Sequence, residues 1–251
     1  MRTQLTTKIS FLICGTQKGG TTALADYLRL HQQLHIPARK ELHFFDNEKY
    51  DWDNPPYWQY HRCCRYSNPG QLWGDATPIT MWWDPAPERI WRYNPSMRLV
   101  MCLRNPVTRA YSHWRMEYTR GKEPLDFDTA LRVEIDRSRA TLPLQDRRYS
   151  YLDRGYYVHQ IKRLWRFFGK EAVLILRQED LLERPHDCLN QVCKHLGISP
   201  MPKIRPQHSR VGSALEPMSP WAKQYLHDCL DGEIETLEKI LGWDCNSWLV
   251  S

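Results

Sequence analysis

The chain has 251 residues, of which 41% are hydrophobic, 12% aromatic and 25% charged, and its formal net charge is +6. This composition excludes a disordered tail, a collagen-like fibre and a disulfide-stapled miniprotein, and the length predicts a single α/β domain over 1–251. No apolar run approaches the roughly 20 residues that cross a bilayer, so no membrane span is expected. The basic residues are dispersed, which argues against a nucleic-acid partner.

The eight cysteines form no C-x-x-C pair. Cys188, Cys193 and His195 have metal-binding side chains, but they fall on an amphipathic helix where core packing is favoured, and we expect no metal site. The segment Met1–Ser10 lacks the apolar core of a signal peptide. We therefore expect a cytoplasmic protein with reduced thiols.

The first predicted unit is a strand, a glycine-rich loop and a helix. Lys8–Cys14 is a short apolar run rich in β-forming residues, which predicts a buried parallel strand. Gly15–Gly20 follows as the loop, and a helix is predicted from Thr21. A short strand is expected at 34–37, whereas 47–72 has no clean periodicity and is expected to be irregular.

Strands and helices alternate in the rest of the chain. Buried strands are expected at Arg98–Leu103 and 172–176. Apolar residues at helical spacing predict five helices, which are placed from Pro106, near 127–139, over 157–168, from Pro185 and up to residue 241. This alternation predicts an α/β fold in three layers, with a central parallel sheet flanked by helices.

The loop between the first strand and the first helix has the sequence G-T-Q-K-G-G-T-T over 15–22. A glycine loop in this context directs backbone N–H groups and the positive end of the helix dipole at one spot, which favours a phosphate-like anion. It departs from the Walker A pattern because position 21 is Thr where that pattern has Lys. The only lysine of the loop is Lys18.

A second anion site is predicted after the strand at Arg98–Leu103. Arg104 stands where this strand ends, and Ser112 lies on the helix that follows. A guanidinium fork and a hydroxyl can converge on one phosphate. Ligands of parallel sheets bind at the strand ends, so two neighbouring anion sites there fit a nucleotide with phosphates at both 5′ and 3′.

These motifs resemble those of the sulfotransferases that use 3′-phosphoadenosine 5′-phosphosulfate (PAPS), and in particular the heparan-sulfate-type branch and its bacterial members. The resemblance implies a P-loop-like fold and covers about 15–245. It rests on six segments: the loop at 15–22, K-E-L-H-F-F-D at 40–46, G-D-A-T-P at 74–78, R-N-P-V-T-R-A-Y-S at 104–112, G-Y-Y-V-H-Q-I-K-R-L at 155–164 and E-D-L-L at 179–182.

The resemblance implies sulfuryl transfer from PAPS to a hydroxyl or amine, with PAP as product and without a metal. It assigns the nucleotide to a set of residues spread over three motifs. These are Lys18, Gly19, Gly20, Thr21 and Thr22 at the 5′ end, Arg104 and Ser112 at the 3′-phosphate, and Arg210 and Gly212 in a C-terminal clasping loop that is only partly present.

The resemblance also implies the catalytic groups. Glu41 is expected to be the general base, and Lys18 to reach the bridging oxygen of the leaving nucleotide. His43 is expected to orient Glu41 or the acceptor, and Asp46 to fix His43. Animal heparan enzymes usually carry a Lys directly before Thr-Pro. This chain has Ala76 at that position.

The acceptor is expected to be a saccharide, with an aromatic or lipid hydroxyl left open. Asp75 is expected to bind the acceptor or to act with Glu41, and Trp82 and Trp83 to form a wall on which a sugar stacks. Two other functions remain open. One is a P-loop kinase that uses Mg-ATP; the other is a non-catalytic module that binds anionic glycans through its +6 charge. The sequence does not indicate an oligomeric state.

Overall fold

The structure is a computed structural model that describes residues 8–64, 67–203 and 217–249. Within these ranges the chain forms two compact units, one from 8–103 with 163–203 and the other from 104–162 with 217–249. In the described part of the chain, no helix is long and apolar enough to cross a membrane.

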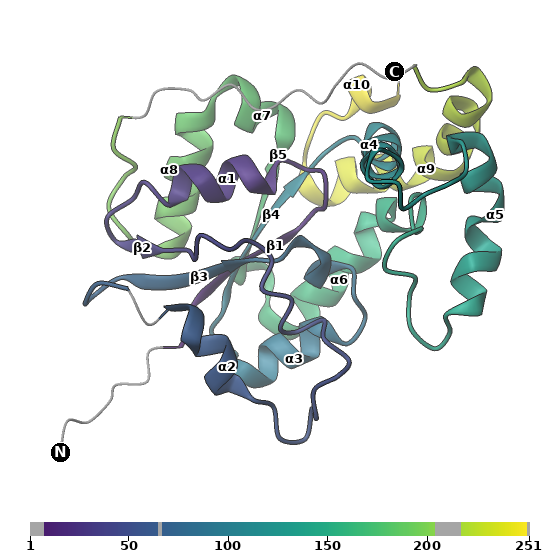
Figure 1. The fold of residues 1–251 in the computed structure, drawn as a ribbon. Coiled ribbons are helices and arrows are strands. Elements are labelled where there is room, and N and C mark those ends of the chain that lie inside the picture. The colour runs from purple at the N-terminus through teal and green to yellow at the C-terminus, as the bar shows by residue number, and fades with distance from the viewer. Residues whose placement is uncertain (1–7, 65–66, 204–216, 250–251) are drawn as a thin grey trace. The chain divides into compact units, whose positions relative to one another are not determined.

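The first unit is built on a parallel five-stranded sheet (Figure 1). The strand order is β2-β3-β1-β4-β5, and every neighbouring pair is parallel. The strands are β1 (Phe11–Gly15), β2 (Leu34–His35), β3 (Leu72–Ala76), β4 (Arg98–Leu103) and β5 (Val173–Arg177). The predicted α/β class with a central parallel sheet is thereby confirmed.

Helices cover both faces of this sheet. α1 (Thr21–Leu28) and α8 (Pro185–Leu196) lie on one side, and α3 (Ala86–Tyr93) lies on the other (Figure 1). The first face is sealed by buried apolar side chains of α1, α8 and the strands. Cys188 and Cys193 of α8 belong to this core, as predicted. Shorter helices are α2 (Tyr57–His61) and α7 (Gln178–Glu183).

Strand β3 lies between β2 and β1 in the sheet, although the sequence analysis places no strand there. Gly74 pairs with Phe11 of β1. A Cβ atom on Gly74 would lie 2.1 Å from the Phe11 ring, so only glycine lets the ring cover this position. β3 carries Asp75 to the carboxyl end of the sheet, next to β1 and the glycine loop that follows it.

The second unit is helical. It contains α4 (Pro106–Thr119), α5 (Phe127–Ala140), α9 (Pro220–Leu241) and α10 (Asn246–Leu249), and α6 (Tyr157–Phe168) begins in it and ends in the first unit. These bounds confirm the helices predicted from Pro106, near 127–139 and over 157–168. One-turn helices of both units are Arg62–Cys64, Pro78–Met81, Asp153–Gly155 and Lys170–Ala172.

Side-chain caps fix where three of these helices begin. Asn105 accepts hydrogen bonds from the N–H groups of Val107 and Thr108, Asp126 accepts one from Thr129, and Ser219 accepts one from Ala222. Each cap satisfies a donor that a helix start leaves without an intrahelical partner. Apolar faces of α4, α5 and α9 then meet in one buried cluster that includes Trp114, Phe127 and Leu226.

Candidate active site

The glycine loop packs directly on the end of β4. The N–H of Thr16 donates to the carbonyl of Cys102 at 3.1 Å, and the N–H of Gly19 donates to the carbonyl of Thr16 at 3.0 Å. A Cβ atom on Gly19 would lie 2.1 Å from the Cys102 carbonyl oxygen. The loop therefore reaches this tight arrangement only with glycine at 19, because the opposing atom is backbone and cannot turn away.

Helix α1 starts at Thr21 without a side-chain cap. The residue before it, Gly20, has a φ of 94°, and no side chain accepts a hydrogen bond at this cap position. The first N–H groups of α1 and the positive end of its dipole thus face the loop, and no side chain of the described residues caps them, which suits an anionic ligand. Lys18, with a φ of 71°, lies in the same loop.

Glu41, His43 and Asp46 form a row of side chains in the segment after β2. His43 Nδ1 lies 2.8 Å from Asp46 Oδ2, and His43 Nε2 lies 3.5 Å from Glu41 Oε2. The Asp46 side chain is fully buried, whereas 38% of the Glu41 side chain is exposed. The row therefore runs from the interior to a carboxylate that a substrate can reach.

The backbone of this segment is held in a strained shape. Glu41 and His43 have φ values of 61° and 52°, in the left-handed region that non-glycine residues rarely adopt. The N–H of Glu41 donates to the carbonyl of Ala76 at the end of β3, at 3.1 Å. Such strain persists where the surroundings hold it, and it is concentrated at functional sites.

The charges of the row reinforce one another. Hydrogen bonds to Asp46 and to Glu41 raise the pKa of His43 to about 9. Burial raises the pKa of Glu41, but the hydrogen bond to His43 and the positive charge of Lys40 outweigh burial and lower it below its usual value. At neutral pH His43 is therefore an imidazolium that donates from both ring nitrogens, and Glu41 is an ionised carboxylate that can accept a proton.

Lys40 connects this row to the start of α1, a contact that the sequence analysis missed. Its Nζ lies 2.6 Å from the Thr22 hydroxyl, 3.2 Å from the Thr21 hydroxyl and 3.5 Å from Glu41 Oε1. The only sequence signal was the position of Lys40 immediately before Glu41. The structure thus brings the glycine-loop helix and the Glu41 row together around one ammonium group.

The residues predicted to hold the 3′-phosphate belong to the second unit. Arg104 Nε donates to the Thr108 hydroxyl at 3.0 Å, and the Arg104 carbonyl accepts a hydrogen bond from the Tyr157 hydroxyl at 3.0 Å. Ser112 is half-buried on α4. Arg210 and Gly212 lie outside the described residues.

Comparison with known proteins agrees with these features. Residues 8–210 match the model of the family described as "Sulfotransferase domain". The chain belongs to this sulfotransferase family. The match covers most of the chain and includes the glycine loop, the Glu41 row and the Arg104 segment.

Two kinds of relative are similar to this sulfotransferase chain. It is 29% identical over 191 residues to mouse heparan sulfate glucosamine 3-O-sulfotransferase 5, and this match covers 75% of this chain and 53% of the relative. It is 32% identical over 188 residues to mouse heparan sulfate glucosamine 3-O-sulfotransferase 6, and this match covers 74% of this chain and 52% of the relative. It thus spans about half the length of these curated relatives. A solved sulfotransferase from Alicyclobacillus acidocaldarius superposes with a TM-score of 0.83 at 25% identity, over 96% of this chain and 98% of that one.

Asp75 of this sulfotransferase is buried, and this burial does not support the predicted contact with the acceptor. It is 2% exposed and accepts hydrogen bonds from the Thr77 hydroxyl at 3.0 Å and the Tyr60 hydroxyl at 3.1 Å. Burial raises the pKa of its carboxyl to about 6, although these hydroxyls oppose the shift. Its carboxyl oxygens thus join Tyr60 of α2 to Thr77, which follows β3.

The predicted sugar-stacking wall of Trp82 and Trp83 is also corrected. These side chains are 2% and 1% exposed, so neither ring face is open to a saccharide. The Trp83 indole N–H donates to Glu48 at 2.6 Å, and Arg163 donates to the Trp82 carbonyl at 2.9 Å. The two tryptophans directly follow the one-turn helix Pro78–Met81, which contacts both β1 and α3. Sequence alone does not distinguish a buried aromatic pair from an exposed one.

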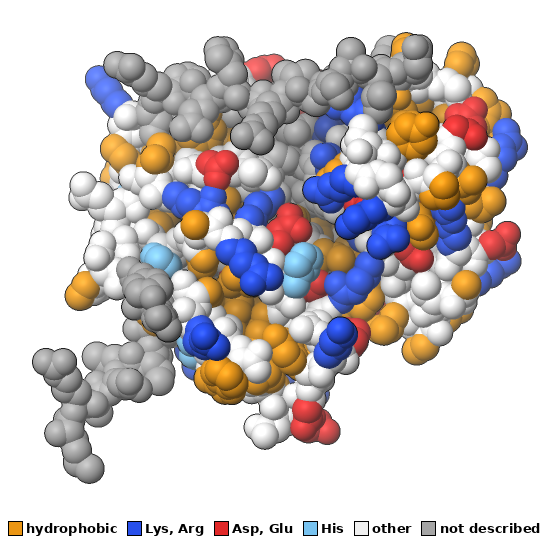
Figure 2. Space-filling view, in the orientation of Figure 1, with side chains coloured by type: hydrophobic (Ala, Val, Ile, Leu, Met, Phe, Trp, Pro, Cys, Tyr) orange, Lys and Arg blue, Asp and Glu red, His pale blue; other side chains and the backbone are white. Residues whose placement is uncertain are grey.

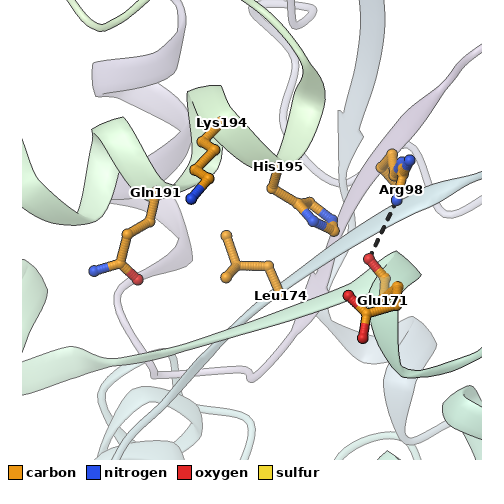
Figure 3. A pocket seen from close by; sticks show the side chains of 6 residues that line it. All are labelled: Arg98, Glu171, Leu174, Gln191, Lys194 and His195. Atoms are coloured by element: carbon orange, nitrogen blue, oxygen red, sulfur yellow. Dashed lines mark hydrogen bonds between the residues drawn. The ribbon is translucent and has the colours of Figure 1, made fainter.

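A pocket of about 490 Å³ opens at the other end of the sheet (Figure 3). Its lining includes Arg98, the first residue of β4, and Lys194 and His195 in the last turn of α8. Arg98 donates to the Glu171 carbonyl at 3.2 Å. Ligands of open parallel sheets bind at the carboxyl ends of the strands, where the glycine loop lies, so this pocket is separate from the candidate active site.

Charged side chains of both signs, with histidine among them, share the face seen in Figure 2. Within the first unit, charges of opposite sign also form ion pairs, since Lys40 lies 3.5 Å from Glu41 and Arg89 lies 2.6 Å from Glu48. On this face the described atoms do not form an unbroken basic field. A surface that holds anionic glycans by charge alone would need such a field.

Proposed function

We propose that the chain transfers a sulfuryl group from PAPS to a hydroxyl or amine of a saccharide by in-line displacement. The observation that carries this proposal is the placement of the Glu41 row beside the uncapped start of α1, joined by Lys40. An anion site and an ionised carboxylate side by side are what a transfer from an anionic donor requires. Family membership supports the same reaction class.

The donor would be held through its phosphates. The N–H groups at 19–22 and the hydroxyls of Thr21 and Thr22 would bind the 5′-phosphate, and Lys18 would reach the bridging oxygen, where negative charge develops. The sequence motif supports Arg104 and Ser112 as ligands of the 3′-phosphate. PAP would be the product left in this site.

In the chemical step, the acceptor oxygen or nitrogen forms a bond to sulfur while the bond from sulfur to the bridging phosphate oxygen breaks. The electron pair of the broken bond stays on that oxygen, and the acceptor's proton passes to Glu41. His43 would hold Glu41 in place through its Nε2 hydrogen, and Asp46 would hold the ring. General-base catalysis of this kind contributes about 10²–10⁴-fold.

A saccharide acceptor is supported by the names of the relatives, which sulfate a glucosamine of heparan sulfate. Two experiments test the function. Calorimetry should show tight binding of PAP without metal and far weaker binding of ATP with or without magnesium. Incubation with PAPS and heparan sulfate should then yield PAP and sulfated product together. Preference for Mg-ATP would replace the proposal with a kinase, and binding of heparan sulfate without turnover would replace it with a glycan-binding module.

A further inference from the structure

Lys40 stands between the two halves of the candidate active site. Its ammonium group contacts both hydroxyls at the start of α1 and also the Glu41 carboxylate, at 2.6, 3.2 and 3.5 Å. Only 19% of its side chain is exposed. Burying an ammonium group costs free energy unless it is paired, and here the Thr21 and Thr22 hydroxyls and the Glu41 carboxylate are its partners.

The position of Lys40 coincides with the path of the transferred group. On the proposed function, the 5′-phosphate of the donor lies at the start of α1, and the acceptor oxygen lies at Glu41. The sulfur atom must lie between these two points, in line with the breaking and forming bonds. Lys40 Nζ contacts a residue at each of these two points. Thr22 lies at the start of α1, where the phosphate would bind, and Glu41 lies where the acceptor would bind.

We propose that Lys40 is a catalytic residue that donates hydrogen bonds to the sulfuryl oxygens during transfer. This inference rests on the proposed function and adds to it the group that neutralises the charge of the moving sulfuryl. Neighbouring strand β3 ends in Ala76, which carries no charge. Lys40 remains protonated throughout, the proton of the acceptor passes to Glu41, and the electron pair of the broken bond remains on the nucleotide.

Lys40 can exchange its partners without moving far. Without the donor, the Thr21 and Thr22 hydroxyls accept from Lys40; with the donor bound, those hydroxyls turn to donate to the phosphate, and the ammonium turns to the sulfuryl group. Burial lowers the pKa of Lys40, while the adjacent Glu41 carboxylate opposes that shift and favours the charged form. The charge is thus supplied in advance, which is how fixed donors lower a barrier.

The test compares Lys40→Met with Arg39→Met. Methionine keeps an unbranched stem but removes the charge. Arg39 is an exposed neighbour, so its replacement removes the same formal charge one residue away. PAP and PAPS affinities are measured by calorimetry, and turnover is measured as PAP release with heparan sulfate as acceptor. Thermal unfolding followed by circular dichroism checks that each variant is folded.

Lys40→Met should lower kcat by about 10²–10³-fold, the usual effect of deleting one donor to a developing anion. Affinity for PAPS should fall several-fold, while affinity for PAP, which lacks the sulfuryl group, should stay within threefold. Lys40→Arg should recover part of the lost kcat, and Arg39→Met should behave like the wild type. A selective loss of this kind is not produced by a merely structural lysine.

Two results would overturn the inference. One is turnover of Lys40→Met within threefold of the wild type; the other is a parallel fall in PAP affinity and kcat, which would make Lys40 a phosphate ligand instead. Failure of the proposed function appears differently, because the wild-type protein itself would then bind no PAP or release none from PAPS.

Discussion

His43 Nδ1 lies 2.8 Å from Asp46 Oδ2, and the Asp46 side chain is completely buried. A buried carboxylate needs a partner, and here the partner is a ring whose other nitrogen faces Glu41 at 3.5 Å. The pair therefore fixes both the orientation and the charge of His43. Because the opposite nitrogen points at the proposed base, the interior of the fold determines how that base is presented.

Replacement Asp46→Asn should lower the pKa of His43 from about 9 towards the usual 6.5, because an amide carries no negative charge to hold the ring proton. Titration of the ring by NMR measures this directly. Asp51→Asn, at an exposed position of the same segment, is the control and should leave the titration unchanged. A His43 pKa that stays near 9 in Asp46→Asn would show that Glu41 alone sets it.

The same shift makes stability depend on pH with a defined sign. The folded protein raises the pKa of His43 above its unfolded value, so the stabilisation is fully present below about pH 6.5 and is lost as pH rises through about 9. The wild type should therefore have a higher free energy of unfolding than His43→Gln, and this difference should be larger at pH 6 than at pH 9.5. Urea unfolding at both pH values measures the gap, and a gap that widens at pH 9.5 would contradict this account.

Much of the fold was predictable because its strongest signals are local. β1, β4 and β5 are short apolar runs, and α6 has apolar residues at helical spacing with Gly169 after it. β3 escaped prediction because Gly74 and Asp75 are rare in strands. Its place in the sheet depends on the Phe11 ring lying over Gly74, which is a contact between distant parts of the chain.

The site was predictable only where a motif carries it. The segment 40–46 indicated Glu41, His43 and Asp46 through resemblance, and the structure brings these three together. The role of Lys40 depends on how this segment folds back onto α1, which no local pattern records. Trp82 was misjudged for the same reason, because burial is decided by the helices that cover the sheet.

Replacement Glu41→Gln should lower kcat by about 10²–10⁴-fold and leave PAP affinity within threefold, because glutamine keeps the shape of the side chain but cannot take a proton. Glu88→Gln removes an exposed carboxylate paired with Arg92 on α3 and should leave turnover unchanged. PAP release with heparan sulfate as acceptor measures both. Unchanged turnover in Glu41→Gln would remove Glu41 from the role of base.

Replacement Gly19→Ala should disrupt the glycine loop. The added Cβ atom would lie 2.1 Å from the Cys102 carbonyl oxygen, so the loop must shift away from β4. Overpacking of this kind typically costs about 1–3 kcal/mol, and the displaced N–H groups would no longer converge on a phosphate. We therefore expect a lower free energy of unfolding and a loss of PAP affinity of at least tenfold.

Gly232→Ala is the matched control, since Gly232 lies within α9 and a Cβ atom there would meet nothing within 4 Å. Alanine in a helix interior is favoured over glycine by about 0.5–1 kcal/mol, so this variant should be slightly more stable and should bind PAP as the wild type does. Urea unfolding and calorimetry separate the two effects. Wild-type PAP affinity in Gly19→Ala would mean that the loop tolerates the shift and that its backbone does not form the phosphate site.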